Sequence, residues 1–332
     1  NSCPTATIEM NFIIKSLEKL NIYGVVIQWD DASIKWEEYS AVIICQTWDY
    51  TETNKIEKFI NWLEDISKKT KLFNSLSILK WNIEKSYLKE LQSEGLPIVP
   101  TIFLDYNNNN TNTNTNGNEL ELQKIQNWNG IIIKPGIGCD SENIAKFDSL
   151  NENALKHIDH IISIKRNVLI QPYLNSIKTH GEISLIYINK IFSHCILKSV
   201  STSTDDYRIQ EKYGGSQKAI PVTQEMLDLG KLTIEKLEKI FSNHATSDTN
   251  DTNATSGTGT GTGTIDNNLL YMRIDILLCD ENCSKQHDLP LNSYLIGEIE
   301  LVEPALYFHE DSLFNSNSMG PDQLAIAISN ML

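Results

Sequence analysis

Apolar and polar positions follow two different periods along the chain, and the changes of period predict the order of its elements. Helical spacing over residues 8–20 and 56–66 is interrupted by short apolar runs at 24–28 and 41–45, which are typical of buried strands. This alternation predicts a small α/β domain with a parallel sheet over residues 1–80. No strand precedes the first helix, so we expect the natural first strand to lie ahead of this sequence.

Residues 81–174 predict a second lobe, of the α+β type. A helical pattern over 82–94 ends at Gly95 and is followed by apolar runs typical of strands, at 102–104, 130–134 and 167–174. The second run ends next to Pro135, and the third contains Pro172.

Residues 175–332 predict a third region. The apolar runs 183–188 and 190–198 indicate a hairpin that turns at Asn189 and Lys190. Two further strand-like runs follow that contain acidic residues, and helical patterns cover 223–241 and 323–331.

Two low-complexity tracts interrupt this order, an Asn/Thr tract at 107–118 and a tract that ends in Gly-Thr repeats at 246–264. Neither contains enough apolar surface to offset the entropy of ordering. We expect both to be flexible surface insertions.

The acidic strands carry the most informative chemistry. Side chains two positions apart on a strand point to the same face, so Glu298 and Glu300 project together, away from Ile299. If the run that contains Asp275 is the neighbouring strand, three carboxylates meet on one face. Hard oxygen ligands in small number suit magnesium that is shared with substrate phosphates. An edge strand with a solvated acidic face is the alternative explanation.

Composition narrows the class of protein. The chain of 332 residues is 40% hydrophobic and 21% charged, which fits a soluble globular protein with more than one lobe. Its net charge of −15 argues against a general nucleic-acid-binding surface, so any phosphate site must be a local positive pocket. We find no apolar run long enough for a membrane span and no secretory signal pattern.

The cysteines are scattered and form no disulfide framework, which predicts a reduced, cytoplasmic protein. Cys279 and Cys283 have the spacing of half a zinc site, but no second pair accompanies them, and loop thiols are the alternative.

A candidate phosphate site follows the second strand of the central lobe. Lys134 closes that strand before a loop that contains Gly136 and Gly138. Glycines let backbone amides approach phosphate oxygens, and lysine supplies a point charge. The run from Gln171 to Leu174 ends the next strand and suits a hinge whose backbone pairs with adenine, although an ordinary strand exit would look the same.

Taken in order, the short motifs of this chain resemble those of the ATP-grasp ligases. The similarity is to the group that holds prokaryotic-type glutathione synthetases and the O-ureido-serine cyclo-ligase of cycloserine biosynthesis, and it runs from about Trp29 to Phe308. The motifs that carry it are Trp48-Asp-Tyr50, Lys80-Trp-Asn82 with Lys85, Val99-Pro-Thr101, Ile133-Lys-Pro135, Gln171-Pro-Tyr-Leu174, Gly181-Glu182, His194 with Lys198, Arg208 with Gln210 and Gly214-Gly215, Arg273-Ile-Asp275, and Glu298-Ile-Glu-Leu-Val-Glu-Pro304.

The resemblance implies a three-part ATP-grasp fold in which two lobes enclose ATP. It assigns the phosphates to Lys85, Lys134, Gly136 and Gly138. It assigns the adenine hinge to Gln171, Pro172, Tyr173 and Leu174, with Glu182 as a ribose or adenine-side contact. It assigns magnesium or manganese to Asp275, Glu298 and Glu300.

The implied reaction transfers the γ-phosphoryl group of ATP to a substrate carboxylate, and an amine then attacks the acyl phosphate. Arg208, Arg273 and Lys198 would hold the substrate carboxylate and this intermediate, whereas surface salt bridging is the alternative role for the arginines. The expected partners are a small carboxylate and a small amine, with no nucleic acid and no membrane, and a homodimer is plausible for the fold. None of these motifs identifies the two substrates.

One position departs from the family pattern. Relatives usually read Gly-Glu-Arg-Ser, whereas this chain has Ile183 between Glu182 and Ser184. The missing cation raises a second hypothesis, a catalytically silent ATP-binding regulatory protein. A third hypothesis is a kinase that stops at phosphoryl transfer.

Overall fold

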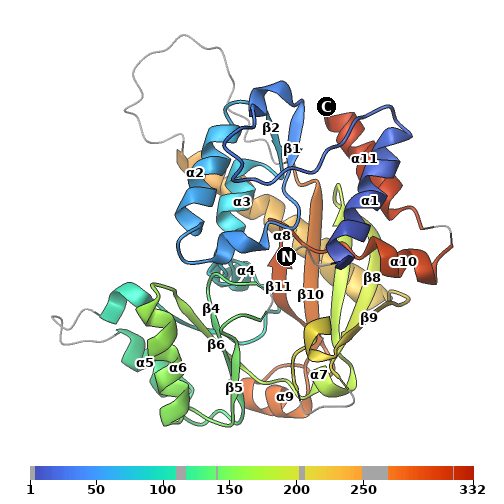
Figure 1. The fold of residues 1–332 in the computed structure, drawn as a ribbon. Helices are drawn as coiled ribbons and strands as arrows, with labels where there is room; N and C mark the ends of the chain where they lie inside the picture. The colour runs from blue at the N-terminus through green and yellow to red at the C-terminus, as the bar shows by residue number, and fades with distance from the viewer. Residues whose placement is uncertain (1–3, 110–116, 140, 202–205, 249–267, 317) are drawn as a thin grey trace.

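A five-stranded antiparallel sheet lies at the centre of the molecule, and two smaller sheets flank it (Figure 1). The central sheet contains the acidic strands that carry the predicted metal ligands. The structure is a computed structural model, and it describes all residues except 1–3, 110–116, 140, 202–205, 249–267 and 317. Within that part of the chain the strand orders are β1-β2, β3-β6-β4-β5 and β11-β10-β7-β8-β9. The strands are β1 Ala41–Ile43, β2 Lys71–Phe73, β3 Ile102–Leu104, β4 Ile131–Pro135, β5 Ala145–Phe147, β6 Val168–Pro172, β7 Glu182–Ile188, β8 Ile191–Ser199, β9 Ser216–Ala219, β10 Tyr271–Leu278 and β11 Tyr294–Glu300.

Helices cover the three sheets, and short 3₁₀ turns connect several elements (Figure 1). The helices are α1 Pro4–Glu18, α2 Ile56–Ile66, α3 Leu76–Asn82, α4 Tyr87–Ser93, α5 Gly117–Lys124, α6 Glu152–Ser163, α7 Ser176–Thr179, α8 Gln224–Asp248, α9 Glu281–His287, α10 Phe308–Phe314 and α11 Gly320–Met331. The 3₁₀ turns are η1 Trp36–Glu38, η2 Trp48–Thr51, η3 Tyr106–Asn109 and η4 Glu211–Tyr213.

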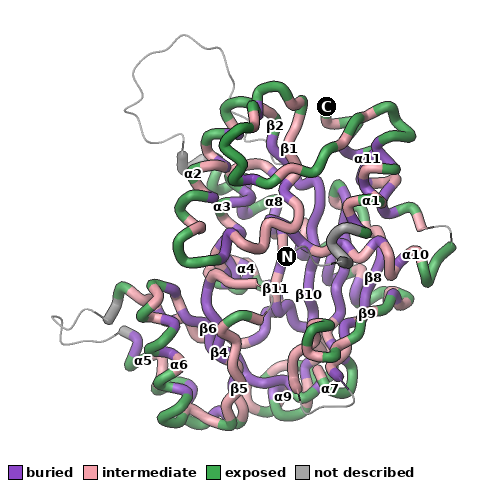
Figure 2. The backbone as a smooth tube through the Cα atoms, in the orientation of Figure 1, coloured by how far each residue is buried: buried purple, intermediate pink, exposed green. Residues whose placement is uncertain are grey.

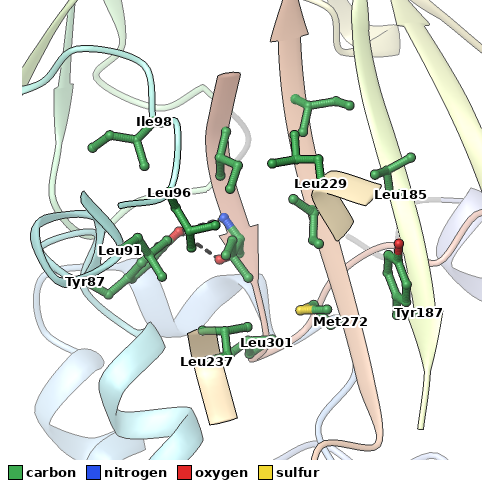
Figure 3. Close-up of a cluster of buried hydrophobic side chains, with 14 of the residues drawn as sticks. Tyr87, Leu91, Leu96, Ile98, Leu185, Tyr187, Leu229, Leu237, Met272 and Leu301 are labelled. Atoms are coloured by element: carbon green, nitrogen blue, oxygen red, sulfur yellow. Dashed lines mark hydrogen bonds between the residues drawn. The ribbon is translucent and has the colours of Figure 1, made fainter. Parts of the chain in front are cut away.

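One face of the central sheet is apolar and is packed against α8 and α4. Leu185 and Met272 from the sheet, Leu229 from α8 and Leu91 from α4 belong to one buried cluster (Figure 3). Side chains alternate between the two faces of each strand, so the residues between these apolar positions point to the opposite face. The alternation predicted from the sequence therefore defines which side chains reach the site.

The opposite face of the central sheet is apolar at one end of the strands and charged at the other. At one end, α1, α10 and α11 pack over Ile186, Ile188 and Ile196, and Figure 1 shows α1 and α11 side by side. At the other end the same face carries charged side chains. Figure 2 shows that the central strands are nevertheless buried along most of their length.

The free edge of β11 is closed by residues that link the N-terminal domain to the central lobe. Asn82 donates its side-chain amide to the Ile299 carbonyl at 2.8 Å and accepts from the Leu301 N–H at 2.7 Å. The Tyr87 hydroxyl donates to the same carbonyl at 2.7 Å, and Figure 3 shows this ring beside β11. The Val99 N–H donates to the Ile296 carbonyl at 2.9 Å. These bonds fix the edge strand on which two of the predicted metal ligands, Glu298 and Glu300, lie.

The first sheet and the central lobe follow the predicted pattern. β1 and β2 are parallel, as predicted for the N-terminal α/β domain. In the four-stranded sheet, β4 lies between β6 and β5, and α6 packs on it through Ile158 and Ile161. The α/β fold class with mixed lobes is therefore confirmed.

Two predicted elements are wrong. Residues 24–28 form no strand, and Val25 and Val26 remain exposed because no neighbouring strand covers them. Of the helix predicted over 82–94, only residues 87–93 form a helix of their own, α4, because α3 ends at Asn82 and a break follows at 83–86. The break has a local cause, since the Lys85 N–H donates to the Gly136 carbonyl at 2.8 Å instead of to its own helix.

The two predicted insertions lie mostly outside the described residues. Their described ends belong to regular elements, because residues 107–109 are in η3, 117–118 begin α5 and 246–248 end α8. The domain boundaries at 80 and 174 stay a prediction. No helix of the described residues is long and apolar enough to cross a membrane.

Candidate active site

The three predicted metal ligands lie on one face of the paired strands β10 and β11. Asp275 is opposite Glu298 in the antiparallel register, and Arg273 is opposite Glu300. The neighbouring apolar residues Ile274 and Ile299 point into the core on the other face. The prediction from side-chain alternation is confirmed, and the sheet brings two carboxylates of β11 beside one of β10.

Asp275 is surrounded by donors. The Ser184 hydroxyl donates to Oδ1 at 2.5 Å, and the Lys198 Nζ lies 3.1 Å from the same oxygen. The Arg273 Nη2 donates to Oδ2 at 2.9 Å. Burial alone would raise the pKa of Asp275, but the charges of Arg273 and Lys198 hold that pKa well below its ordinary value. Asp275 is therefore a buried, ionised carboxylate.

Arg273 joins the two strands. Its Nη2 also donates to Glu300, and its Nη1 donates to the Ala305 carbonyl at 3.3 Å. Burial lowers the pKa of Arg273, but the charge of Asp275 outweighs it and raises the pKa well above the ordinary value. Burial raises the pKa of Glu300 to about 7 although Arg273 opposes the shift, since Glu298 and Asp275 repel a further negative charge. Burial therefore opposes the ionisation of Glu300 more strongly than Arg273 favours it.

Glu182 and Lys198 form a buried ion pair between β7 and β8. They are directly opposite in the strand register, and Ser184 follows Glu182 by two positions, so it shares the same face. Burial raises the pKa of Glu182 against the charge of Lys198. The structure therefore brings Lys198, which we expected beside the substrate, together with Asp275 and Glu182.

Lys85 connects β11 with the candidate phosphate loop. Its Nζ lies 2.9 Å from Glu298 Oε1 and donates to the Gly138 carbonyl at 2.9 Å. The loop is also fixed by the Gly136 N–H, which donates to the Asn167 carbonyl at 2.7 Å. In this arrangement Lys85 holds the loop through a carbonyl oxygen.

Lys134 is a buried cation that is available to a ligand. It is buried, and no hydrogen bond or ion pair joins it to another of the described residues. Burial lowers the pKa of Lys134, partly offset by the charge of Glu298. A desolvated lysine without a partner is costly, so an anionic ligand at this position would be favourable.

The predicted adenine hinge lies at the end of β6. The Gln171 side-chain amide donates to Thr101 Oγ1 at 2.8 Å, and the Tyr173 N–H donates to the Gly130 carbonyl at 2.9 Å. Pro172 and Leu174 are buried beside them. Lys146 from β5 lies over the Tyr173 ring, with its Nζ 3.7 Å from the ring centroid.

Arg208 is not brought into the carboxylate cluster in the described part of the chain. Its Nε and Nη2 donate to Asp206 at 2.9 and 2.6 Å, and its guanidinium stacks on Tyr213 at 3.4 Å from the ring centroid. The hydrogen bond to Asp206, against a smaller effect of burial, raises the pKa of Arg208. Its role toward substrate stays a prediction.

The departure at Ile183 does not remove a cation from the carboxylate face. Ile183 is buried in the apolar cluster with Ile276 and Ile296, whereas its neighbours Glu182 and Ser184 point to the other face. The position therefore gives little support to a silent protein.

The donor set fits a hard divalent cation that is shared with a phosphate ligand. Among the described residues, no three His, Cys, Asp or Glu side chains are grouped closely enough to hold a metal ion by themselves. Magnesium usually takes only one or two protein carboxylates and completes its shell with water and phosphate oxygens. Burial first, and then the charges of Glu298 and Asp275, raise the pKa of Glu300 to about 7, so an added positive charge beside Glu300 would be favourable.

Sequence reasoning missed the roles of Ser184 and Asn82. Ser184 holds Asp275, and its spacing of two from Glu182 on a strand is a signal that could have found it. Asn82 pairs with the backbone of β11 across more than two hundred positions, and nothing local in the sequence indicates that partner.

Comparison with known proteins finds relatives of this chain. Residues 2–74 match the family model for the N-terminal domain of the D-cycloserine synthetase DcsG. The cycloserine biosynthesis protein DcsG of Streptomyces lavendulae is 24% identical over 198 residues, which cover 59% of this chain and 64% of the relative. The match thus spans a little less than two thirds of that protein's length.

Solved structures share the fold over nearly the whole chain. The crystal structure of D-cycloserine synthetase DcsG matches with a TM-score of 0.76 and 19% identity, covering 99% of this chain and 96% of that one. A D-alanine–D-alanine ligase from Bacillus anthracis complexed with ATP matches with a TM-score of 0.57 and 13% identity, covering 99% and 94%. These similarities show that the chain has the fold of the ATP-grasp ligases.

Proposed function

We propose that this protein is an ATP-dependent ligase that joins a carboxylate to an amine on a small amino-acid or peptide-like substrate. The reaction would pass through an acyl phosphate and release ADP and phosphate. The observation that carries the proposal is the face shared by β7, β8, β10 and β11, where Asp275, Glu298 and Glu300 lie beside Lys85, Lys198 and Arg273. The names of the relatives, a cycloserine synthetase and a D-alanine–D-alanine ligase, support the same reaction class.

The nucleotide would occupy the region between the central lobe and this face. Lys134 would meet a phosphate because it lacks another partner among the described residues, and Lys85 would do so by exchanging a contact with Glu298 or Gly138. The amides of Gly136 and Gly138 would approach the same oxygens. The segment from Gln171 to Leu174 would hold adenine, and Glu182 would reach the ribose side.

Asp275, Glu298 and Glu300 would hold magnesium or manganese. The metal would neutralise phosphate charge in the loose transition state of phosphoryl transfer. Arg273 already spans Asp275 and Glu300, so its guanidinium would be placed to bind the planar oxygens of the substrate carboxylate and then the acyl phosphate. Lys198 and Arg208 would complete the cationic environment of the substrate.

A direct test is ADP release in the presence of magnesium and a panel of D- and L-amino acids and dipeptides. We expect ADP release that depends on the amino acid, and hydroxylamine should convert the acyl phosphate into a hydroxamate. Glu298→Gln and Glu300→Gln should lower the rate by about 10²-fold or more, because charge stabilisation at a preorganised site is worth that much. Glu57→Gln, a change at an exposed position of α2, should leave the rate unchanged.

The outcomes separate the three hypotheses. ATP binding without turnover on any member of the panel would favour the silent protein. A stable phosphorylated product without an amide would indicate a kinase. Turnover that survives both glutamine variants would remove the proposed metal site from the mechanism.

A further inference from the structure

A cavity in the N-terminal domain lies between α2 and the segment 29–36. Its volume is about 490 Å³, within the range of about 300–1,000 Å³ that is typical of small-molecule sites. All of its described lining residues lie between 29 and 69, whereas the residues proposed above for ATP and magnesium begin at Lys85. Three tryptophans, three lysines and three aspartates are among the lining residues.

The tryptophans form one aromatic wall of the cavity. Trp29 and Trp36 are buried, and Trp62 contacts both. The ring centroid of Trp62 lies 5.7 Å from that of Trp29 and 5.3 Å from that of Trp36, with the planes inclined at 58° and 72°. Phe59 stacks on Trp62 at 5.6 Å. These contacts hold the indoles in fixed orientations, so the wall favours a planar ring that can pack against them.

Most of the charged groups that line the cavity already have partners. Lys55 pairs with Asp49 at 2.7 Å, and Lys69 pairs with Asp65 at 2.5 Å. Asp31 accepts from the hydroxyl and the N–H of the serine two positions ahead, at 2.7 and 2.9 Å. These groups therefore keep one lysine and one aspartate of the lining available to a ligand.

The available groups are Lys58 and Asp30. Both are exposed, and no hydrogen bond or ion pair joins either of them to another described residue. Lys58 is four positions before Trp62 on α2, so the two side chains share a face of the helix. The Trp62 Nε1 is buried without a hydrogen-bond partner in the described part of the chain. An unpaired buried donor is costly, so an acceptor that a ligand brought within its reach would be favourable.

Hydrogen bonds connect this cavity to the candidate phosphate loop. The Trp29 Nε1 donates to Asp49 Oδ1 at 3.0 Å, and the Lys55 Nζ donates to Oδ2 of the same residue at 2.7 Å. Asp49 belongs to η2, and in that turn the Trp48 carbonyl accepts from the Cys139 thiol at 3.5 Å. Cys139 directly follows Gly138 of the phosphate loop. A ligand that displaced Trp29 or Lys55 would therefore act on the turn that the loop contacts.

We infer that this cavity is an effector site for a small zwitterion that carries an aromatic ring. The ring would pack on the indoles, the carboxylate would lie beside Lys58 and the Trp62 N–H, and the ammonium would lie beside Asp30. An aromatic amino acid and a dipeptide with an aromatic residue share this chemistry. Occupancy would change the affinity for ATP through η2, a coupling that does not require the ligase reaction.

The first experiment tests the ring. D- and L-phenylalanine are compared with D- and L-alanine, and L-alanyl-L-phenylalanine with L-alanyl-L-alanine, by calorimetric titration into the full chain. At least one aromatic compound should bind ~10- to 100-fold more tightly than its alanine counterpart, the range expected for burial of a phenyl group. It should also change the tryptophan fluorescence. The pair with the larger difference distinguishes an amino acid from a dipeptide.

The second experiment tests the two charges. Phenethylamine lacks the carboxylate of phenylalanine and 3-phenylpropionate lacks its ammonium, so each should bind about 2- to 5-fold more weakly, as expected for ion pairs exposed to water. Lys58→Met should remove the preference over phenethylamine, and Asp30→Asn should remove the preference over 3-phenylpropionate. Lys68→Met and Glu57→Gln are the matched controls, because both residues are exposed and lie outside the described lining of the cavity.

The third experiment tests the coupling. The affinity for ATP, measured by calorimetry with and without the aromatic ligand, should change by about 5-fold or more, and ATP should change the affinity for that ligand by the same factor. Lys58→Met should raise the ligand concentration needed for this effect, whereas Lys68→Met should not. The alanine counterpart should leave the affinity for ATP unchanged.

The inference is overturned if no aromatic compound binds more tightly than its alanine counterpart. It is also overturned if the charge preferences survive in Lys58→Met and Asp30→Asn, which would place the ligand elsewhere. Binding that leaves the affinity for ATP unchanged would overturn the effector role. Failure of the ligase proposal is seen separately, as absent ADP release, because all three experiments measure binding without turnover.

Discussion

Arg273 and Asp275, two positions apart on β10, are joined side chain to side chain by three hydrogen bonds. The Arg273 Nε lies 3.0 Å from Oδ1 and 3.2 Å from Oδ2, and Nη2 lies 2.9 Å from Oδ2. Both side chains are buried. The residue proposed for the acyl phosphate and the residue proposed for magnesium therefore neutralise each other, and a bound nucleotide with its metal would have to redistribute this pairing.

The Asp275→Asn change should impair both stability and activity. It leaves Arg273 and Lys198 buried without their shared carboxylate, and breaking a buried ion pair costs about 3–5 kcal/mol. We expect the free energy of unfolding, measured by urea denaturation, to fall by this order, and ADP release to fall by about 10²-fold or more.

Asp65→Asn is the matched control for that change. Asp65 pairs with Lys69 on the surface of α2, with both side chains well exposed, and such pairs contribute little. Equal unfolding curves for the two variants would show that the Asp275 cluster is not stabilising.

Gly181 should be far less tolerant of alanine than Gly95, although both have a positive φ. A Cβ at Gly181, with φ +73°, would lie 2.3 Å from the Lys198 carbonyl oxygen, whereas nothing lies within 4 Å of a Cβ at Gly95, with φ +82°. Gly95→Ala should cost about 1–2 kcal/mol from the left-handed backbone alone.

Gly181→Ala should cost at least ~1 kcal/mol more, because β7 and β8 must separate to accept the methyl group. It should also lower ADP release, since Glu182 and Lys198 are opposite each other at this position. Thermal unfolding of the two purified variants measures the difference, and similar losses of stability would contradict the close approach of the two strands at Gly181.

Lys134→Met should separate ligand binding from stability. Because Lys134 is buried and has no partner among the described residues, an apolar side chain of similar length should fold as well or slightly better. The affinity for ATP should fall ~10- to 100-fold, since a charge-assisted bond to phosphate is lost.

Lys85→Met is the comparison for Lys134→Met. It should weaken ATP binding and also destabilise the protein, because it leaves Glu298 without its lysine. Calorimetric titration with ATP, together with urea unfolding, distinguishes the two lysines. Unchanged ATP affinity in Lys134→Met would remove that residue from the nucleotide site.

The parts of the site that could be predicted are those controlled by side-chain alternation. The period of two places Glu298 and Glu300 together and sends Ile299 to the core, and the structure confirms both. The order of short motifs was sufficient to predict the fold. A strand at 24–28 was predicted from a short apolar run. A strand also needs a neighbouring strand to pair with, and the sequence of one segment does not identify that neighbour.

Long-range partners could not be predicted. Lys85 was expected to contact phosphate, yet its Nζ holds the carbonyl of Gly138 and a carboxylate more than two hundred positions away. Glu9 accepts from the Leu306 N–H only because α1 folds back beside the segment after β11, and nothing near Glu9 in the sequence indicates that partner. The chemistry of each residue is visible in the sequence, whereas its neighbours depend on the packing of the whole chain.

Glu9 should make the stability of the protein fall as the pH rises from about 4.5 to about 7. Burial raises its pKa in the folded protein to about 7 from an ordinary value of 4.5, so the folded state holds the proton more tightly than the unfolded state. This contribution is fully present below pH 4.5 and is lost as the pH rises through 7. A shift of this size corresponds to about 3 kcal/mol.

Glu9→Gln should remove that dependence, because glutamine keeps the acceptor for the Leu306 N–H and has no proton to lose. Urea unfolding of both proteins at pH 5, 6, 7 and 8 gives the difference in the free energy of unfolding, in which all other titrating groups cancel. The unchanged protein should lose stability relative to the variant up to pH 7 and then stay level. Parallel profiles over this range would mean that burial does not raise the pKa of Glu9 in the folded protein.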